Sequence, residues 1–143
     1  MIVIGSDHGG YELKEYLKAY LKQKEIPFVD IGCDGQSCDY PDYARIAVQK
    51  ILSGDCEKGI LCCGTGIGIS IAANKYAGIR AALVSEPVSA RLATEHNNAN
   101  ILCFGGRVTG GALAAACVDA WLEAEFLGGR HAARVHKIEP SAY

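Results

Sequence analysis

The sequence lacks an excess of charge of either sign, and it lacks any long run of apolar residues. Its 143 residues carry a formal net charge of −2 at neutral pH, which gives no electrostatic reason to expect nucleic acid or an acidic membrane as a partner. No apolar run approaches the roughly 20 residues of a membrane span. The first residues also lack the basic region and long apolar core of a secretory signal peptide. We therefore expect a cytoplasmic protein with neither nucleic acid nor membrane among its partners.

Motifs that would define a metal or nucleoside triphosphate site are missing as well. No pair of cysteines or of histidines has the spacing of zinc ligands. No lysine follows the glycine-rich segment 64–68 as it would in a P-loop. A cysteine phosphatase loop is excluded because no arginine stands six residues after Cys62 or Cys63. We therefore expect no bound metal.

The seven cysteines are an odd number, and no secretion signal accompanies them. This combination is typical of free thiols in a reducing compartment. Because cysteine within apolar strands and helices behaves as a small hydrophobic residue, we interpret five of the seven as structural or incidental. These five are Cys33, Cys38, Cys56, Cys103 and Cys117.

Strand and helix patterns alternate along the whole chain. Short apolar runs typical of buried strands are separated by segments with the i, i+3, i+4 spacing of helices. The predicted strands cover residues 2–4, 28–31, 59–62, 79–84 and 101–104. This alternation predicts parallel βαβ units and a single α/β domain, residues 1–143, with a five-stranded parallel sheet in a Rossmann-like three-layer α/β/α arrangement.

Polar or glycine-rich residues follow three of these strands. Asp7 and His8 follow the first strand, residues 63–68 follow the third, and Arg107 follows the fifth. In such sheets ligands bind outside the carboxyl ends of the strands. We therefore expect these three segments to form one site.

The segment from Cys63 to Gly68, CGTGIG, carries the strongest chemical signal. A glycine-rich turn from strand to helix leaves backbone N–H groups unpaired and pointing outward, which suits an anion or an oxyanion. The same helix N-terminus favours thiolate over thiol, so Cys63 is a candidate base for removing a proton next to a carbonyl, whereas Cys62 should face the core. The alternative is a dinucleotide site, with Glu86 as its acidic residue, although Ile69 replaces the last glycine of that fingerprint.

The remaining candidates each have a plainer structural explanation. Asp7 is a good helix cap, and a histidine such as His96 at the end of a helix often interacts only with the helix dipole. Asn97 beside it could bind a ligand through hydrogen bonds. Arg130 and Arg134 would share one face of a helix and could hold a phosphate dianion. The alternative for the two arginines is a solvated basic tail.

Six segments occur in order over essentially the whole chain, without a large gap. They are SDHGGYELK near the N-terminus, DYPDYA at 39–44, CGTGIGISIAANK at 63–75, GIRAALVSEP at 78–87, EHNNANILCFGGR at 95–107 and GGRHAARV at 128–135. Together they resemble the type B ribose-5-phosphate isomerases of the RpiB/LacA/LacB sugar-phosphate isomerase family. The resemblance implies the sheet order 2-1-3-5-4 and a cofactor-independent aldose–ketose isomerase, which interconverts ribose 5-phosphate and ribulose 5-phosphate in pentose phosphate metabolism.

The resemblance also implies a role for each site residue. Cys63 would be the base that moves a proton between C1 and C2 through an enediolate, Thr65 would support it, and His96 would help to open the furanose ring. Another branch of the family has a glutamate base at the position of Ile69, so this chain is assigned to the cysteine branch. His8 and the arginines would surround the phosphate. The implied substrate-binding residues are Asp7, His8, Gly64, Gly66, Ile67, Gly68, Asn97, Arg107, Arg130 and Arg134.

Three questions stay open at the level of the sequence. The family includes isomerases of pentose phosphates and of hexose 6-phosphates such as those of allose or galactose. The resemblance implies a homodimer or a dimer of dimers with sites built from both subunits, but not which subunit supplies each arginine. A non-enzymatic alternative is a nucleotide-binding or thiol-sensing module, with Cys63 as the sensor.

Overall fold

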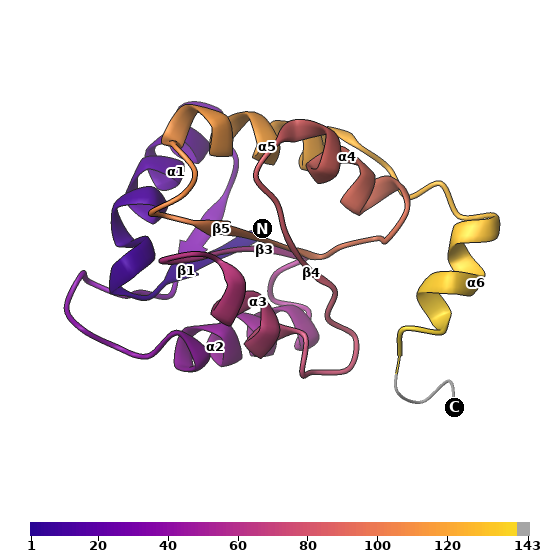
Figure 1. Cartoon of the computed structure of the whole chain (residues 1–143), viewed down its shortest axis with the longest axis horizontal. Coiled ribbons are helices and arrows are strands. Elements are labelled where there is room, and N and C mark those ends of the chain that lie inside the picture. Colours follow the sequence, from indigo (N-terminus) through magenta and orange to yellow (C-terminus); the bar gives the residue numbers. More distant parts are fainter. Residues whose placement is uncertain (140–143) are drawn as a thin grey trace.

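Five parallel strands form the centre of the fold, seen in a computed structural model that describes residues 1–139 (Figure 1). The strands are β1 Ile2–Ser6, β2 Phe28–Asp30, β3 Lys58–Cys63, β4 Ala81–Leu83 and β5 Ile101–Gly105. They lie in the order β2-β1-β3-β5-β4, and each neighbouring pair is parallel. The five-stranded parallel sheet and the implied strand order are both confirmed. The last four residues of the domain predicted over 1–143 lie outside the described part of the chain.

Helices cover both faces of this sheet, which gives the predicted three layers. α1, α4 and α5 pack on one face, and α2 and α3 pack on the other (Figure 1). The helices are the 3₁₀ helix η1 His8–Gly10, α1 Tyr11–Gln23, α2 Tyr40–Leu52, α3 Ile67–Ala73, α4 Pro87–Glu95, α5 Gly111–Glu123 and α6 Arg130–His136. All-parallel sheets have such cover because each crossover connection places a helix on one of the two faces.

Side chains of the central strands alternate between two apolar cores. Ile4, Cys62 and Phe104 face the layer of α1, α4 and α5, whereas Val3 and Leu61 face α2 and α3. All five are fully buried, as expected for central strands that are covered on both faces. Burying a leucine, isoleucine or phenylalanine side chain contributes roughly 1.5–3 kcal/mol to the stability of the fold. The sheet therefore holds the turns at its edges in place.

The boundaries of all five strands differ from the prediction by one to three residues, and the differences at β4 and β3 bear on the site. β4 is three residues long instead of covering 79–84, because it is an edge strand that pairs with β5 alone. The N–H of Ile79 bonds to the Tyr76 carbonyl within a turn instead. β3 extends through Cys63, so this cysteine is the last residue of the strand and not the first residue of the turn.

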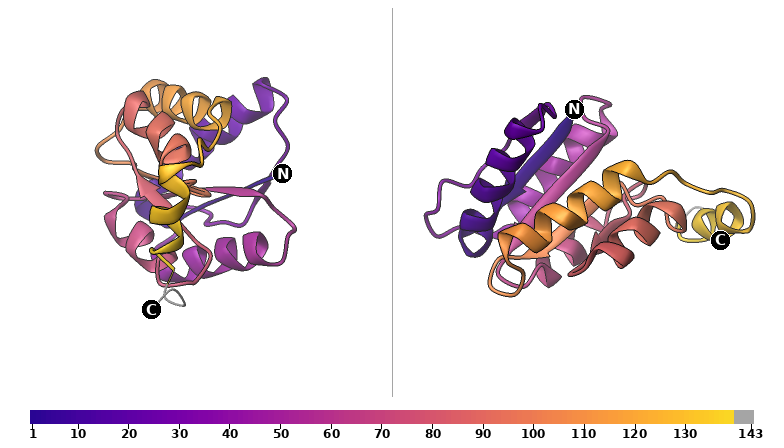
Figure 2. Two further views of the ribbon diagram at one scale, coloured as in Figure 1. Left: turned by 90° about the vertical axis from the view of Figure 1, so that its right-hand side faces the viewer. Right: turned by 90° about the horizontal axis from the view of Figure 1, so that it is seen from above.

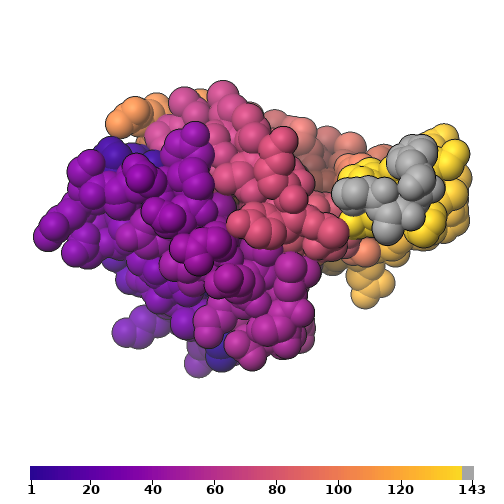
Figure 3. All heavy atoms as spheres, turned by 90° about the horizontal axis from the view of Figure 1, so that it is seen from below, coloured from indigo at the N-terminus to yellow at the C-terminus, as the bar shows by residue number. Residues whose placement is uncertain are grey.

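α6 stands away from the sheet at one end of the molecule (Figures 2 and 3). Just beyond it, the Glu139 carboxylate accepts a hydrogen bond from Nη1 of Arg80 at 3.1 Å, which ties this region to the body of the protein. The helix places Arg130 and Arg134 one turn apart on one face. The sequence predicted this arrangement for a helical tail, and both arginines are exposed.

Candidate active site

The turns that follow β3 and β5 lie side by side at the carboxyl edge of the sheet. The N–H of Gly106 donates to the Cys63 carbonyl at 2.8 Å, and the N–H of Arg107 donates to the Gly64 carbonyl at 3.0 Å. The Arg107 guanidinium also reaches the β3 turn, since a Cβ atom added to Gly64 would lie 3.0 Å from its Nη1 atom. Arg107 is exposed, so its charge is held beside the turn and open to a ligand.

The turn after β1 completes this group of three. The N–H of Asp7 donates to the Cys62 carbonyl at 3.2 Å. A Cβ atom added to Gly9 would lie 3.0 Å from the nitrogen of Gly64, and one added to Gly106 would lie 2.7 Å from the carbonyl oxygen of Gly9. The three turns therefore touch backbone to backbone, as predicted for segments that follow the carboxyl ends of parallel strands.

Cys63 ends β3 with its sulfur next to the glycine-rich turn. The N–H of Gly66 donates to Sγ at 3.1 Å, and Cys63 is 4% exposed. Gly66 has a φ of 79°, and a Cβ atom there would lie 2.5 Å from the side chain of Leu83, so glycine is needed to present this N–H to the sulfur. Hydrogen bonds to an ionised acceptor are about twice as strong as neutral ones. This donor is therefore placed to hold a thiolate.

Cys62 lies one residue earlier, on the opposite face of β3. It is fully buried in the core next to α1, and burial raises the pKa of its thiol far above the ordinary range. Burial likewise raises the pKa of Cys103, and it raises the pKa of Cys117 to about 11. These three thiols are small apolar groups of the core, as the sequence predicted for Cys103 and Cys117.

Two N–H groups of the β3 turn are paired within the turn, which corrects the prediction that the turn leaves its N–H groups unpaired. One is the Gly66 donor to the cysteine sulfur, and the other is the N–H of Ile67, which donates to Oγ1 of Thr65 at 3.2 Å. Short hydroxyl side chains often bond to the backbone two residues on. Thr65 and Ile67 are exposed, and Gly68 lies in the first turn of α3, packed against Tyr40 of α2.

Asp7 and His8 lie at the start of η1. The Asp7 carboxylate accepts a hydrogen bond from the N–H of Gly10 at 3.1 Å and is 7% exposed, so the capping role that the sequence left open is present. His8 is exposed, and its Nδ1 accepts a hydrogen bond from the N–H of Cys38 at 3.3 Å. Neutral His8 then carries its proton on Nε2, which gives it a donor for an anion.

Two hollows flank these turns. The first has a volume of about 490 Å³, in the range of small-ligand sites. It is lined by Asp7, His8, Cys38, Asp39, Tyr40, Pro41 and Asp42. The second, of about 400 Å³, is bordered by Thr65, Gly105 and Thr109 among others. The DYPDYA segment therefore lies beside His8, and the hollow beside Thr65 has a largely apolar lining that includes Leu83, Val84 and Val108.

His96 and Asn97 lie at the opposite edge of the sheet, so a single chain does not bring them to Cys63. α4 begins beyond the carboxyl end of β4 and runs back across the sheet, so it ends near the amino end of β5. There the N–H of Gly59, near the start of β3, donates to the Asn100 carbonyl at 2.9 Å. A strand of five residues separates the two edges by roughly 15 Å.

His96 instead joins the basic residues of α6. Its ring stacks on the ring of His131, with centroids 4.2 Å apart and an interplanar angle of 11°. Burial, and then the charges of His96, Arg130 and Arg134, lower the pKa of His131. An anion placed here would relieve this concentration of positive charge. His131 is not among the site residues that the sequence predicted. Its place between Arg130 and Arg134 on one helix was the signal that could have found it.

Metal-ligand clusters and membrane-spanning helices are both absent from the described residues. Within residues 1–139, no three side chains of His, Cys, Asp or Glu come together as a metal site would require. Over the same range, no helix has both the length and the apolar character needed to cross a membrane. All seven cysteines are free thiols.

Comparison with known proteins gives one consistent result. A profile of the family described as ribose/galactose isomerase matches residues 2–138. Ribose-5-phosphate isomerase B of Escherichia coli is 49% identical over 138 residues, which cover 96% of this chain and 93% of that protein. A ribose 5-phosphate isomerase from Thermotoga maritima has a crystal structure that aligns with a TM-score of 0.95 and 55% identity, covering 96% of each chain.

A second solved structure is that of ribose-5-phosphate isomerase B from Mycoplasma genitalium with bound ribulose-5-phosphate. It aligns with a TM-score of 0.90 and 43% identity, and the match covers 96% of this chain and 92% of that chain. Each match extends over almost the full length of both proteins compared. The matched structures agree with the strand order observed here. By sequence and by fold, the chain belongs to the ribose/galactose isomerase family.

Proposed function

We propose that this protein interconverts ribose 5-phosphate and ribulose 5-phosphate without a cofactor, in the cytoplasm, as a step of pentose phosphate metabolism. The observation that carries the proposal is the Cys63 thiol next to the N–H of Gly66, among turns that present His8 and Arg107. The choice of substrate is supported by the Escherichia coli relative, named for this reaction, and by the ribulose-5-phosphate in the Mycoplasma structure.

In this mechanism Cys63 acts as the base. As a thiolate it removes the proton from C2 of the open-chain aldose and returns it to C1, while a proton passes from O2 to O1 of the enediolate. Charge develops on the carbonyl oxygen, and a backbone donor of the β3 turn that is not already paired with Cys63 or Thr65 would lower the barrier by roughly 3 kcal/mol. Thr65 supports the base from the same turn. Ile69, which stands at the position of the alternative glutamate base, is fully buried. This favours Cys63 as the base.

The separation of the two residue clusters supports a homodimer. Cys63, His8 and Arg107 lie at the carboxyl edge of the sheet, whereas His96 and the arginines of α6 lie at the amino edge. In a two-fold dimer, the amino-edge cluster of one copy can meet the carboxyl edge of the other. The position of α6, away from its own sheet (Figure 2), suits such contact with a second copy.

Each cluster then supplies part of one site. From the first copy, Asp7 binds sugar hydroxyls and the Gly64–Gly68 turn holds the enediolate. From the second copy, His96 helps to open the furanose ring, because an imidazole can exchange a proton near neutral pH, and Asn97 contacts the sugar. Arg130 and Arg134 surround the phosphate together with Arg107 and His8, and paired guanidinium groups suit a phosphate dianion.

The proposal is tested by assaying purified protein with ribose 5-phosphate after dialysis against a chelator and without added nucleotide. We expect conversion to ribulose 5-phosphate, with exchange of the C2 proton for solvent deuterium as the signature of the enediolate. A panel that includes the 6-phosphates of allose and galactose should give the highest kcat/KM for the pentose phosphate.

Two other results would contradict the proposal. A higher kcat/KM for a hexose 6-phosphate would reassign the substrate while keeping the chemistry. Absence of turnover with every sugar phosphate, together with tight nucleotide binding, would replace the isomerase with a binding module.

A further inference from the structure

His131 is the buried member of the basic cluster at the amino edge of the sheet. It is 8% exposed, whereas its neighbours Arg130 and Arg134 on α6 are exposed. Its imidazole ring lies flat against that of His96, with centroids 4.2 Å apart and an interplanar angle of 11°. We propose that His131 is a positioning residue, which holds the His96 imidazole in the orientation that ring opening requires.

This inference rests on the proposed function, in which His96 helps to open the furanose ring. An acid–base group must lie within hydrogen-bond reach of the oxygen atoms that it serves, and a misplacement of about 1 Å can cost about 10²-fold in rate. The direction of a histidine ring is often set by a hydrogen bond to one of its nitrogens. Among residues 1–139, the contact found for the ring of His96 is instead the stack on His131. A stack fixes the plane of a ring through its face and leaves both nitrogens at its edge available for proton exchange.

The backbone around the two rings holds the stack together. The N–H of Leu127, in the segment between α5 and α6, donates to the carbonyl of Glu95 at 3.0 Å, one residue before His96. The N–H of His131 donates to the carbonyl of Gly128 at 2.9 Å. Gly128 has a φ of 64°, a conformation that glycine adopts readily. Both rings belong to one chain, so they keep their relative position when that chain meets a second copy.

The charges around the stack assign different roles to the two rings. Burial, followed by the charges of His96 and of the two α6 arginines, lowers the pKa of His131. Two stacked imidazolium rings would repel each other, so a neutral His131 lets His96 take up and release the proton. The carboxylate of Glu95, the neighbour of His96 on α4, is paired with Arg91 at 2.7 Å. The stack is therefore the contact on which the position of the His96 ring depends.

The burial of His131 argues against a direct role in binding the phosphate. Arg130 and Arg134 are exposed and can reach a ligand, whereas His131 is covered and presents a ring face to His96. A ligand of the phosphate would need an ionisable or hydrogen-bonding nitrogen. A positioning residue needs only a flat ring of about the same size, and this difference allows the two roles to be separated.

The test replaces His131 by leucine, which fills the space without an aromatic ring, and by phenylalanine, which keeps a flat ring but has no nitrogen. Two reactions are then compared. Conversion of ribose 5-phosphate starts from the cyclic sugar and requires ring opening. Exchange of the C1 proton of ribulose 5-phosphate in deuterium oxide does not, because this ketose is already open-chain. In that exchange Cys63 removes the C1 proton to give the enediolate, exchanges it with solvent and returns a deuteron to C1.

We expect His131→Leu to lower kcat for ribose 5-phosphate about tenfold, less than the roughly 10²–10⁴-fold of a lost acid–base group. The same variant should exchange the C1 proton of ribulose 5-phosphate at the wild-type rate. His131→Phe should behave as the wild type in both assays. The matched control is His136→Leu, which changes an exposed histidine of the same helix and should affect neither reaction.

Nuclear Overhauser effects between the ring protons of His96 and His131 test the stack in the wild type without substrate. Their absence would overturn the proposal. An equal loss of both rates in His131→Leu, or a His131→Phe enzyme as slow as His131→Leu, would also overturn it. A wild-type protein that shows these effects but converts no sugar phosphate would contradict the proposed function and, with it, the role of the stack.

Discussion

Cys62 and Cys63 are adjacent in the sequence but lie in different chemical environments. Side chains alternate across a strand, so Cys62 enters the core next to α1, while Cys63 faces α2 and α3 at the very end of β3. Only the second position is reached by the N–H of Gly66. A shift of one residue therefore separates a packing thiol from a candidate base.

The first prediction concerns these two residues. Cys63→Ala should lower kcat for ribose 5-phosphate by about 10²–10⁴-fold, the range of a lost general base, while calorimetry shows that the substrate still binds. Cys62→Ala should lower the free energy of unfolding, because it leaves a small cavity, but should change kcat little. An essential Cys62, or near-normal turnover by Cys63→Ala, would contradict the assignment of the base.

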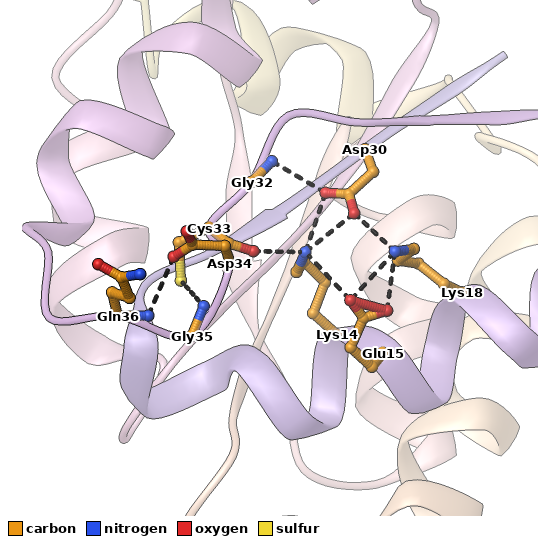
Figure 4. A network of polar contacts seen from close by, with 9 residues as sticks. All are labelled: Lys14, Glu15, Lys18, Asp30, Gly32, Cys33, Asp34, Gly35 and Gln36. Carbon is orange, nitrogen blue, oxygen red and sulfur yellow. Dashed lines mark hydrogen bonds and ion pairs between the residues drawn. The ribbon is translucent and has the colours of Figure 1, made fainter.

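At the scale of elements, a buried ion pair joins α1 to β2 and to the loop beyond it. Lys14 is 1% exposed and bonds to both carboxylate oxygens of Asp30, which also pairs with Lys18 at 2.7 Å. Burial raises the pKa of Asp30, but hydrogen bonds from Lys18, the N–H of Gly32 and Lys14 outweigh it, so the pKa lies below its usual value. Lys14 also bonds to the Cys33 carbonyl and so holds the loop that follows β2 (Figure 4).

The second prediction is that Asp30→Asn destabilises the protein by about 3 kcal/mol, because it removes the carboxylate nearest to the buried Lys14 charge. Urea unfolding at pH 7 measures the change. The control is Asp55→Asn, which removes an exposed partner of Lys50 at 3.6 Å and should cost less than about 1 kcal/mol. Equal effects of the two variants would show that the buried pair adds no stability.

The same pair predicts a dependence of stability on pH. Because the folded pKa of Asp30 is lowered, the unfolded chain binds its proton first as the pH falls. The stabilisation is complete above the unfolded pKa of about 3.9 and is lost as the pH falls through the folded value. The difference in stability between the wild type and Asp30→Asn should therefore shrink below about pH 4. A difference that stays constant down to pH 2 would contradict this prediction.

At the scale of the whole molecule, the βαβ topology separates the predicted site residues. A helix that follows a parallel strand must return to the amino edge before the next strand begins. α4 and α5 therefore deliver His96 and α6 to the edge opposite Cys63 and Arg107. Under the proposed function, one chain holds two incomplete halves of the site, and a symmetric pair of chains can bring them together twice.

Subunit mixing tests this arrangement. A Cys63→Ala chain mixed with an Arg134→Ala chain should regain about a quarter of the wild-type activity at low substrate, because half of the dimers are mixed and each has one intact site. The matched control mixes Cys63→Ala with Arg107→Ala. Both of these lesions lie at the carboxyl edge, so neither site of the mixed dimer is intact and no recovery is expected.

Two outcomes would contradict the shared site. Verified mixed dimers without recovery in the first combination would place Cys63 and Arg134 in one chain. A fully active monomer would remove the need for a second copy.

The sequence by itself determined the features that depend on short-range pattern. The alternation of strands and helices, the glycine-rich turn and the preference for Cys63 over Cys62 follow from periodicity and from the chemistry of neighbouring residues. The sheet order was implied by the family resemblance alone. The absence of the alternative glutamate base could also be read from the sequence, because Ile69 occupies its position in one motif.

Only the tertiary structure decided which residues far apart in the chain come together. The amino-edge position of His96 and its stack on His131 depend on where α4 and α5 end, which no local pattern records. The bond between Lys14 and Asp30 joins residues on different elements. These features rest on the packing of whole elements, and so they follow from the fold and not from the order of residues.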